Sequence, residues 1–207
     1  MSKQKTTGKY HHGDLRNALI LVAMQVLNEQ GMSALSMREL ARLTGVGHNA
    51  PYRHFKNKAE LLEAVASMGF RQLKALNLRL ELEFANDPET QLFESGAHIL
   101  KIATKQPELF NLMFGGRISL HDCGEELKQE SEASLQSLIK IIANGQKQEV
   151  FAKEDLFKQT LAAMSMVHGF SAMVSSGMLQ EVAQCDQRLK ALMLQVFDVL
   201  IHGLKKR

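Results

Sequence analysis

The 207-residue sequence contains no tryptophan, only three prolines and only two cysteines. Cys123 and Cys185 are too few for a disulfide scaffold, and they lack the paired spacing of a structural zinc site. No run of about 18 apolar residues is present, so the sequence predicts no transmembrane helix. Residues 1–9 have no apolar core of a signal peptide, and we therefore expect a cytoplasmic protein.

Signals of β-structure and of common enzymes are also missing. Alternating Val, Ile, Thr and Tyr with hairpin turns do not occur, which excludes an all-β fold. There is no Gly-x-Ser-x-Gly, no phosphate-binding loop and no Glu-x-x-His pair for a di-metal bundle. His121 and Cys123 resemble metal ligands, but two donors alone do not make a site. We expect no enzyme activity, no metal and no cofactor.

Positive charge is concentrated in the first part of the chain. Residues 1–60 carry nine Lys or Arg against four Asp or Glu, whereas the whole chain has a net charge of +3. The remaining residues are therefore slightly acidic. A basic segment beside a near-neutral one is typical of a head that binds a polyanion. An architectural protein that binds DNA by charge alone would show a broader basic surface.

Apolar residues recur at spacings of three and four along the whole chain, which predicts an all-α fold. Asp14 can cap a first helix that Gly31 ends in a left-handed cap. The capping box from Ser36 to Glu39 opens a short second helix that ends before Gly45. The further predicted segments are 48–55, 57–83, one opening at Asp87-Pro88, 107–114, 122–144 ended by Gly145, 155–179 and 184–205.

These segments divide into three parts. Residues 1–13 are polar and basic and form a flexible arm, which either reaches into a minor groove or is a disordered tail. Residues 14–60 form a three-helix headpiece with a helix-turn-helix, in which Ala41 and Gly45 allow a close crossing and a tight turn. The long helix from Asn57 joins it to a larger helical bundle, residues 61–207, for ligand binding and dimerisation.

The segment that follows the turn carries the functional signal. Between 48 and 54 it contains two His and one each of Asn, Tyr and Arg, which a helix meant only for packing does not need. The alternative is a solvated loop before the long helix. In a helix-turn-helix this segment is the recognition helix, which lies in the major groove of DNA.

Three runs, MRELA (37–41), GV (45–46) and YRHFKNK (52–58), followed by Leu61-Leu62, resemble the DNA-binding domain of the tetracycline-repressor (TetR) family. The resemblance covers about residues 12–62. In the body, QPELFNLMF (106–114) and VHGF (167–170) resemble a subfamily whose sensor domain has a Trp-His-Gly signature. Met164 stands where that subfamily has its tryptophan.

The resemblance implies a set of DNA contacts. The implied residues are Arg38, His48, Asn49, Ala50, Tyr52, Arg53, His54 and Lys58. Residues 48–50 would face base edges, and Arg53 would lie near bases or backbone. Tyr52 and His54 would hold phosphates, and Arg38 and Lys58 would bind the flanking phosphates. These roles agree with the usual preferences of the side chains. Phe55 is expected to plug the core behind this segment.

Two residues depart from the family pattern in the recognition segment. Gly47 stands where a Ser or Thr usually caps the helix and binds a phosphate. Pro51 cannot donate a hydrogen bond to the carbonyl of Gly47, four residues earlier. Either the helix starts late, or its first turn is distorted.

The last helix has a wide apolar stripe, which fits either an intrachain core or a dimer interface. The resemblance favours the dimer, with interface residues Leu161, Leu189, Leu192, Met193, Val196, Phe197 and Leu200. Two recognition helices about 34 Å apart would then meet successive major grooves of a palindromic operator.

The central helices are expected to enclose a cavity for a small, hydrophobic effector. Its predicted lining is Leu100, Phe110, Met113, Phe114, Met164, His168 and Phe170, each of which also suits an ordinary core. His98 and His168 are either polar anchors or simply satisfied in the fold. By resemblance, the ligand tilts the long fourth helix, changes the separation of the two headpieces and relieves repression, acting through its different affinity for the two forms.

Overall fold

The computed structural model describes residues 14–205, apart from the side chains of residues 182 and 186. The arm at 1–13, with its predicted DNA contacts, lies outside the described residues. The elements are α1 (Leu15–Gln30), α2 (Met37–Thr44), the 3₁₀ turn η1 (Pro51–Arg53), α3 (Lys58–Glu83), α4 (Pro88–Lys105), α5 (Pro107–Phe114), α6 (Glu125–Lys147), α7 (Leu156–Ser175), α8 (Gln180–Ala183) and α9 (Asp186–Leu204). Residues 14–205 contain no strand, which confirms the all-α prediction.

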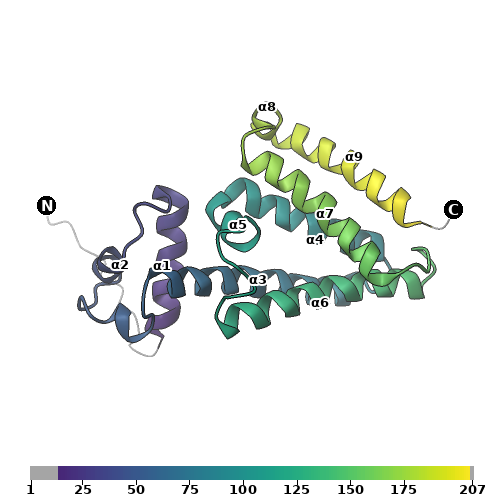
Figure 1. Cartoon of the computed structure of the whole chain (residues 1–207). Helices are drawn as coiled ribbons and strands as arrows, with labels where there is room; N and C mark the ends of the chain where they lie inside the picture. Colours follow the sequence, from purple (N-terminus) through teal and green to yellow (C-terminus); the bar gives the residue numbers. More distant parts are fainter. Residues whose placement is uncertain (1–13, 206–207) are drawn as a thin grey trace, which may run out of the picture.

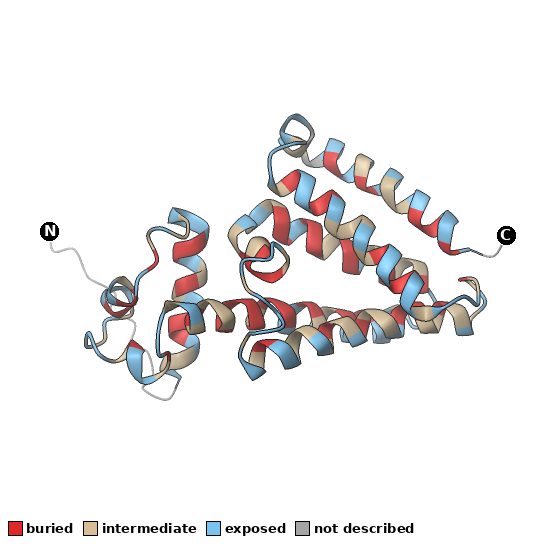
Figure 2. Ribbon diagram, in the orientation of Figure 1, coloured by how far each residue is buried: buried red, intermediate tan, exposed pale blue. Residues whose placement is uncertain are grey.

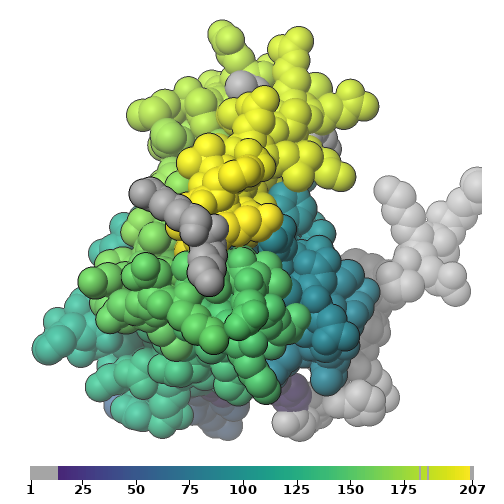
Figure 3. All heavy atoms as spheres, turned by 90° about the vertical axis from the view of Figure 1, so that its right-hand side faces the viewer, coloured from purple at the N-terminus to yellow at the C-terminus, as the bar shows by residue number. Residues whose placement is uncertain are grey.

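The helices form a small head and a larger body (Figure 1). The head holds α1, α2 and η1, and α3 runs from it along the whole length of the body beside α6. The helices α4, α5 and α7 lie over this pair, and α9 covers α7 and α4 as the outermost layer (Figures 1 and 3). Within 14–205, no helix combines the length and the apolarity needed to cross a membrane.

Five side chains cap the predicted helix starts. Each accepts a hydrogen bond from the backbone N–H three residues later, which satisfies one of the unpaired donors of a first turn. They are Asp14, Ser36, Asn57, Asp87 and Asp155. The helix bounds confirm the predicted starts near 57, 87, 107 and 155 and the end of α5 at Phe114.

Several helix ends differ from the prediction. Gly31 has a positive φ of 79°, but its ψ of 178° is extended and not left-handed helical. The capping box at α2 is half formed, because the Glu39 carboxylate binds Arg42 and not the backbone of Ser36. The segment 155–179 breaks after Ser175, and the short helix α8 follows the turn at Gly177, whose φ is 83°.

Helix α6 starts later and ends later than the sequence predicted. Asp122 does not cap it, since its carboxylate is bound within the preceding loop by Ser119 and His121. Gly145 does not end it either, since the helix continues to Lys147. The buried Phe151 ring lies where a Cβ of residue 145 would stand. Glycine is required there by a close approach of the ring, not by a left-handed turn.

Buried faces run along the inner side of every long helix (Figure 2). The largest apolar cluster passes without interruption from the head, through Leu19 and Phe55, to Phe70, Met113 and Leu127 of the body. Two smaller clusters lie beneath α9, one against α4, α6 and α7 and one against α4 and α7. Head and body therefore share one core across α3, on both sides of the predicted boundary at residue 60.

Candidate nucleic-acid interface and effector pocket

The turn of the predicted helix-turn-helix is present in the structure. Gly45 ends α2 in the left-handed conformation, with φ 70° and ψ 24°. The N–H of Val46 returns to the carbonyl of Ala41 at 3.0 Å, which closes the turn. A glycine adopts this backbone without the strain that a Cβ would add. The turn then directs the chain into the segment 47–55.

Pro51 makes that segment a chain of tight turns and not a regular α-helix. Ala50 N–H donates to Gly47 O at 2.8 Å, and Arg53 N–H donates to Ala50 O at 3.1 Å, both three residues back. Pro51 itself forms the first residue of η1, where no N–H is needed. Both alternatives left by the sequence apply in part, because the helical turn starts late, at Pro51, and it is a 3₁₀ turn that follows the turn at residues 48–50.

The predicted DNA-contacting residues lie on one short stretch and mostly face outward. Arg38, His48, Asn49, Tyr52 and Arg53 are exposed, whereas Ala50, His54 and Lys58 are half-buried. Within residues 14–205, neither Arg38 nor Arg53 has an ion-pair or hydrogen-bond partner, so both guanidinium groups are available to an outside anion. The rings of His48 and Tyr52 meet edge to face, 6.5 Å apart between centroids.

Two cations near this stretch are already engaged. The ammonium of Lys58 donates to the carbonyl oxygen of Met32 at 2.8 Å and ties the start of α3 to the loop after α1. Arg42 forms two hydrogen bonds with Glu39, at 2.9 and 2.6 Å, and this pairing lowers the pKa of the Glu39 carboxyl. Lys58 keeps two further N–H groups for a phosphate.

Phe55 is buried behind the recognition segment, as expected, with 1% of its surface exposed. The guanidinium carbon of Arg16, on α1, lies 5.3 Å from the centre of its ring. The same guanidinium forms an ion pair with Glu126 at the start of α6. Glu126 also binds Arg71 of α3 at 3.0 Å. This group of side chains, the head–body network, joins the head to two helices of the body.

The Arg16–Glu126 pair is expected to contribute about 0.5–1 kcal/mol to stability, because both side chains are partly exposed. The measurement is a double-mutant cycle in urea with Arg16→Gln and Glu126→Gln. The pair Glu149–Lys153, whose side chains are 80% and 71% exposed, serves as the control and should show almost no coupling. A coupling energy at the Arg16 pair as small as in the control would contradict this role.

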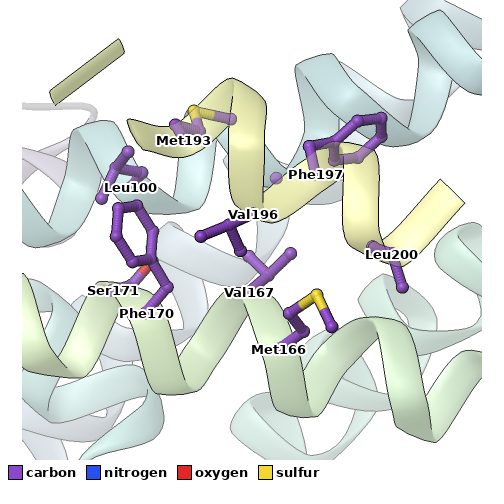
Figure 4. A pocket seen from close by; sticks show the side chains of 10 residues that line it. Leu100, Met166, Val167, Phe170, Ser171, Met193, Val196, Phe197 and Leu200 are labelled. Carbon is purple, nitrogen blue, oxygen red and sulfur yellow. The ribbon is translucent and has the colours of Figure 1, made fainter. Parts of the chain in front are cut away.

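Within the described residues, at least three hollows lie against α7 in the body. The α7–α9 cavity lies between α4, α7 and α9, has about 290 Å³ of empty space and is lined by Leu100, Phe170 and other apolar side chains (Figure 4). The α4–α7 cavity has about 270 Å³ and includes Met164 and His168. The α5–α7 groove has about 860 Å³, part of it open to solvent, and includes Phe110, Phe114 and His168.

Six of the seven predicted effector residues therefore line one of these hollows. The exception is Met113, which is buried in the core against α3. Its side chain covers Gly69 so closely that a Cβ on residue 69 would overlap the sulfur. Sequence reasoning missed three polar members of the groove, Asn111, Ser175 and Ser176, because isolated polar residues on amphipathic helices carry no signal of their own.

His168 is the one titratable residue that lines two hollows. Its ring lies 4.3 Å from that of Phe114, with an angle of 38° between the planes. Burial lowers the pKa of His168 to about 4, so the ring is uncharged at pH 7. His98, the other predicted polar anchor, lines none of these three hollows, and its buried Nε2 has no hydrogen-bond partner.

The predicted dimer residues occupy mixed positions. Leu189, Met193 and Leu200 are buried inside the chain, under α9. Leu192, Val196 and Phe197 are half-buried, and the Phe197 ring packs edge to face on Phe93 at 4.9 Å. Leu161 is 50% exposed. The apolar stripe of α9 is thus an intrachain contact in large part.

Other apolar side chains are exposed on α7 and α9, and apart from Leu161 they were not singled out in the sequence. Leu194 is 48% exposed and Val199 63% on α9, and Met173 is 37% exposed on α7. Together with Leu161, these residues form the outer apolar face. Among the described residues, no group of three or more His, Cys, Asp or Glu is placed to hold a metal ion.

Comparison with known proteins agrees with this architecture. Residues 19–65 match the family described as "Bacterial regulatory proteins, tetR family", and residues 92–196, about half of the chain, match "Tetracyclin repressor-like, C-terminal domain". The chain therefore belongs to the tetR family of bacterial regulatory proteins, and the sequence resemblance is confirmed. A sensor domain of the Trp-His-Gly type stays a prediction.

Individual relatives match over parts of their length. The HTH-type transcriptional regulator AcrR of Shigella flexneri is 29% identical over 53% of this chain and 50% of its own. The tetracycline repressor protein class C of Escherichia coli is 49% identical over 25% of this chain and 23% of its own. The chain thus spans about half, or less, of the length of the curated relatives it matches.

Solved structures match over nearly the whole chain. A Rhodococcus sp. RHA1 protein of unknown function has a TM-score of 0.79 and 27% identity, and the match covers 96% of this chain and 99% of that one. The fatty acid degradation regulator FadR of Bacillus halodurans has a TM-score of 0.70 and 18% identity, with 96% and 100% covered. At that identity the second match shows the fold alone.

Proposed function

We propose that the protein is a cytoplasmic, sequence-specific DNA-binding transcriptional repressor that acts as a homodimer on a palindromic operator and is released by a small effector. The observation that carries the proposal is the set of exposed polar side chains on α2 and the recognition segment. Arg38 and Arg53 have no partner within residues 14–205, and His48, Asn49 and Tyr52 are exposed with them. Cations bind phosphates and amides read adenine. The names of the relatives, a transcriptional regulator and a tetracycline repressor, support the same function.

The outer apolar face supports the dimer. Leu161, Met173, Leu194 and Val199 all belong to α7 and α9 and are exposed in the single chain. A second copy that buries this face would form a four-helix contact with two helices from each chain. Placing the interface here, and not on the buried stripe of α9, avoids opening the intrachain core.

Transmission from the body to the head is proposed to run through α5 and α3. Phe110 and Phe114 of α5 line the groove, and Met113 on the same helix packs on Gly69 of α3. Helix α3 begins at Lys58, directly after the recognition segment. Suppose that α5 has two positions and that the ligand has a higher affinity for one of them. Binding would then favour that position of α5 and, through α3, a shift of the head.

The test is fluorescence anisotropy on DNA from upstream of the gene, against a scrambled duplex, at physiological salt. Binding to the upstream DNA should be at least about a thousandfold tighter than binding to the scrambled duplex. Two chains should bind each operator, one to each half-site. Arg38→Ala should weaken binding to every sequence and lower the salt slope by about one for each half-site.

The matched control is Lys153→Ala, since this lysine is 71% exposed in the loop before α7 and should leave operator affinity unchanged. Equal, strongly salt-dependent binding of the wild type to both duplexes would contradict sequence-specific recognition and leave charge as the only attraction.

A further inference from the structure

We propose that the α5–α7 groove binds an uncharged aromatic compound that carries a hydroxyl or a similar hydrogen-bonding group. The inference rests on the proposed function of the body as an effector domain and names the chemical class of the effector. The groove is lined by Phe110, Asn111, Phe114, Gly115, His168, Gly169, Ala172, Ser175 and Ser176.

The shape and the aromatic walls of the groove select a flat ligand. Phe110, Phe114 and His168 form a continuous row of rings, with centroid distances of 5.5 and 4.3 Å. Aromatic rings prefer offset or edge contacts at such distances, and a ligand ring can extend the row. Gly169 and Ala172 of α7 also line the groove and are exposed, and their small size leaves space for a ligand ring.

The residues that line the groove favour an uncharged ligand over an ionised one. No Lys, Arg, Asp or Glu is among the residues that line it. His168 cannot serve as a counter-ion at pH 7, because burial holds its pKa near 4. A carboxylate or an ammonium group would lose part of its hydration without meeting a side chain of opposite charge in the lining, which is unfavourable. A neutral molecule does not have this cost.

Polar atoms inside the groove still need a partner. The hydroxyl oxygen of Ser175 is buried and has no hydrogen-bond partner within residues 14–205. A buried hydroxyl without a partner is unfavourable, and a ligand hydroxyl would satisfy it. The amide of Asn111 and the nitrogens of neutral His168 offer both donors and acceptors at the same opening.

The α7–α9 cavity is the competing location (Figure 4). It has one polar lining residue, Ser171, whose hydroxyl is also buried and unpaired. It has about 290 Å³ of empty space, whereas the groove, which is partly open to solvent, has about 860 Å³. It also contains no histidine or amide. The groove is therefore the better match for a flat ligand with a polar group.

The experiment compares two probes of nearly equal shape, 2-naphthol and 2-naphthoate, on the full-length protein at pH 7.5. The sequence has no tryptophan, so the probe fluorescence is measured with little protein background. We expect 2-naphthol to bind at least tenfold more tightly than the anion. His168→Phe, which keeps a ring and removes the nitrogens, and Ser175→Ala should each weaken 2-naphthol binding about three- to tenfold.

Ser165→Ala is the matched control, because this serine is exposed on α7 and lines none of the three hollows. Thermal melting checks that each variant is folded, and Ser175→Ala loses only an unpaired hydroxyl. Tighter or equal binding of 2-naphthoate, no binding of 2-naphthol, or unchanged affinity in both variants would each overturn the inference. A loss on Ser171→Ala alone would place the ligand in the α7–α9 cavity.

Operator binding is read separately by anisotropy, so that the two proposals can fail independently. Intact operator binding without any naphthol binding overturns the ligand class and leaves the regulator. Naphthol binding by a protein that shows no operator preference supports the groove site but contradicts the proposed function. Binding of 2-naphthol that also releases the operator supports both.

Discussion

Replacing Phe55 with alanine is expected to lower the free energy of unfolding by about 3–5 kcal/mol. The ring is 1% exposed and belongs to the cluster that joins head and body. Its removal leaves a cavity that the short turns of residues 47–55 cannot fill, because Pro51 and the bonds around it fix their backbone. The Arg16 guanidinium above the ring would lose its aromatic contact as well.

Urea denaturation followed by circular dichroism measures this change. Phe157→Ala is the matched control, since that phenylalanine is 65% exposed on α7, and it should change the free energy by less than about 0.5 kcal/mol. Phe55→Leu should recover part of the loss. If Phe55→Ala were as mild as the control, the head would not depend on this plug.

Helix starts could be predicted from the sequence because their cause is local. Asp14, Asn57, Asp87 and Asp155 each bond a backbone N–H three residues later. Neither partner depends on the rest of the fold. Pro107 at the start of α5 is equally local, because its fixed φ and missing N–H suit the first turn.

Helix ends were predicted less well because glycine has more than one cause. Gly145 stands inside α6 and allows the approach of Phe151, a contact that only the tertiary structure creates. Gly177, which the sequence placed inside a helix, ends α7 with a positive φ. The same residue type thus marks a close packing in one case and a turn in the other, and local sequence does not separate them.

The candidate sites show the same division. The recognition segment could be located from its polar residues and turn, but its 3₁₀ geometry depends on how Pro51 is accommodated. The apolar stripe of α9 was assigned to a dimer, yet Leu189 and Met193 pack inside the chain. Periodicity shows that a face is covered and does not show by which partner. The exposed Leu194 and Val199 are visible only after the intrachain contacts are known.

Lowering the pH from about 6.5 to about 4 is expected to destabilise the protein through His168 by roughly 3 kcal/mol. Burial lowers the pKa of this histidine from 6.5 to about 4, and no charged group contributes to the shift. In this pH range the unfolded chain therefore binds a proton that the folded chain does not. Stability is full above 6.5 and is lost as the pH falls toward the folded-state pKa.

The measurement is the difference in unfolding free energy between wild type and His168→Phe at several pH values from 4 to 7. The pKa of His98 is also lowered, first by burial and then by the positive charges of Lys101 and Arg79. His98 and the carboxylates are present in both proteins, so their contributions cancel in the difference. The variant should be less sensitive to acid than the wild type. Parallel curves for wild type and His168→Phe would mean that the imidazole is hydrated in solution. A hydrated imidazole accepts a proton more readily and would then attract an anionic ligand. The acid sensitivity of wild type and His168→Phe therefore also tests why the groove should prefer an uncharged compound.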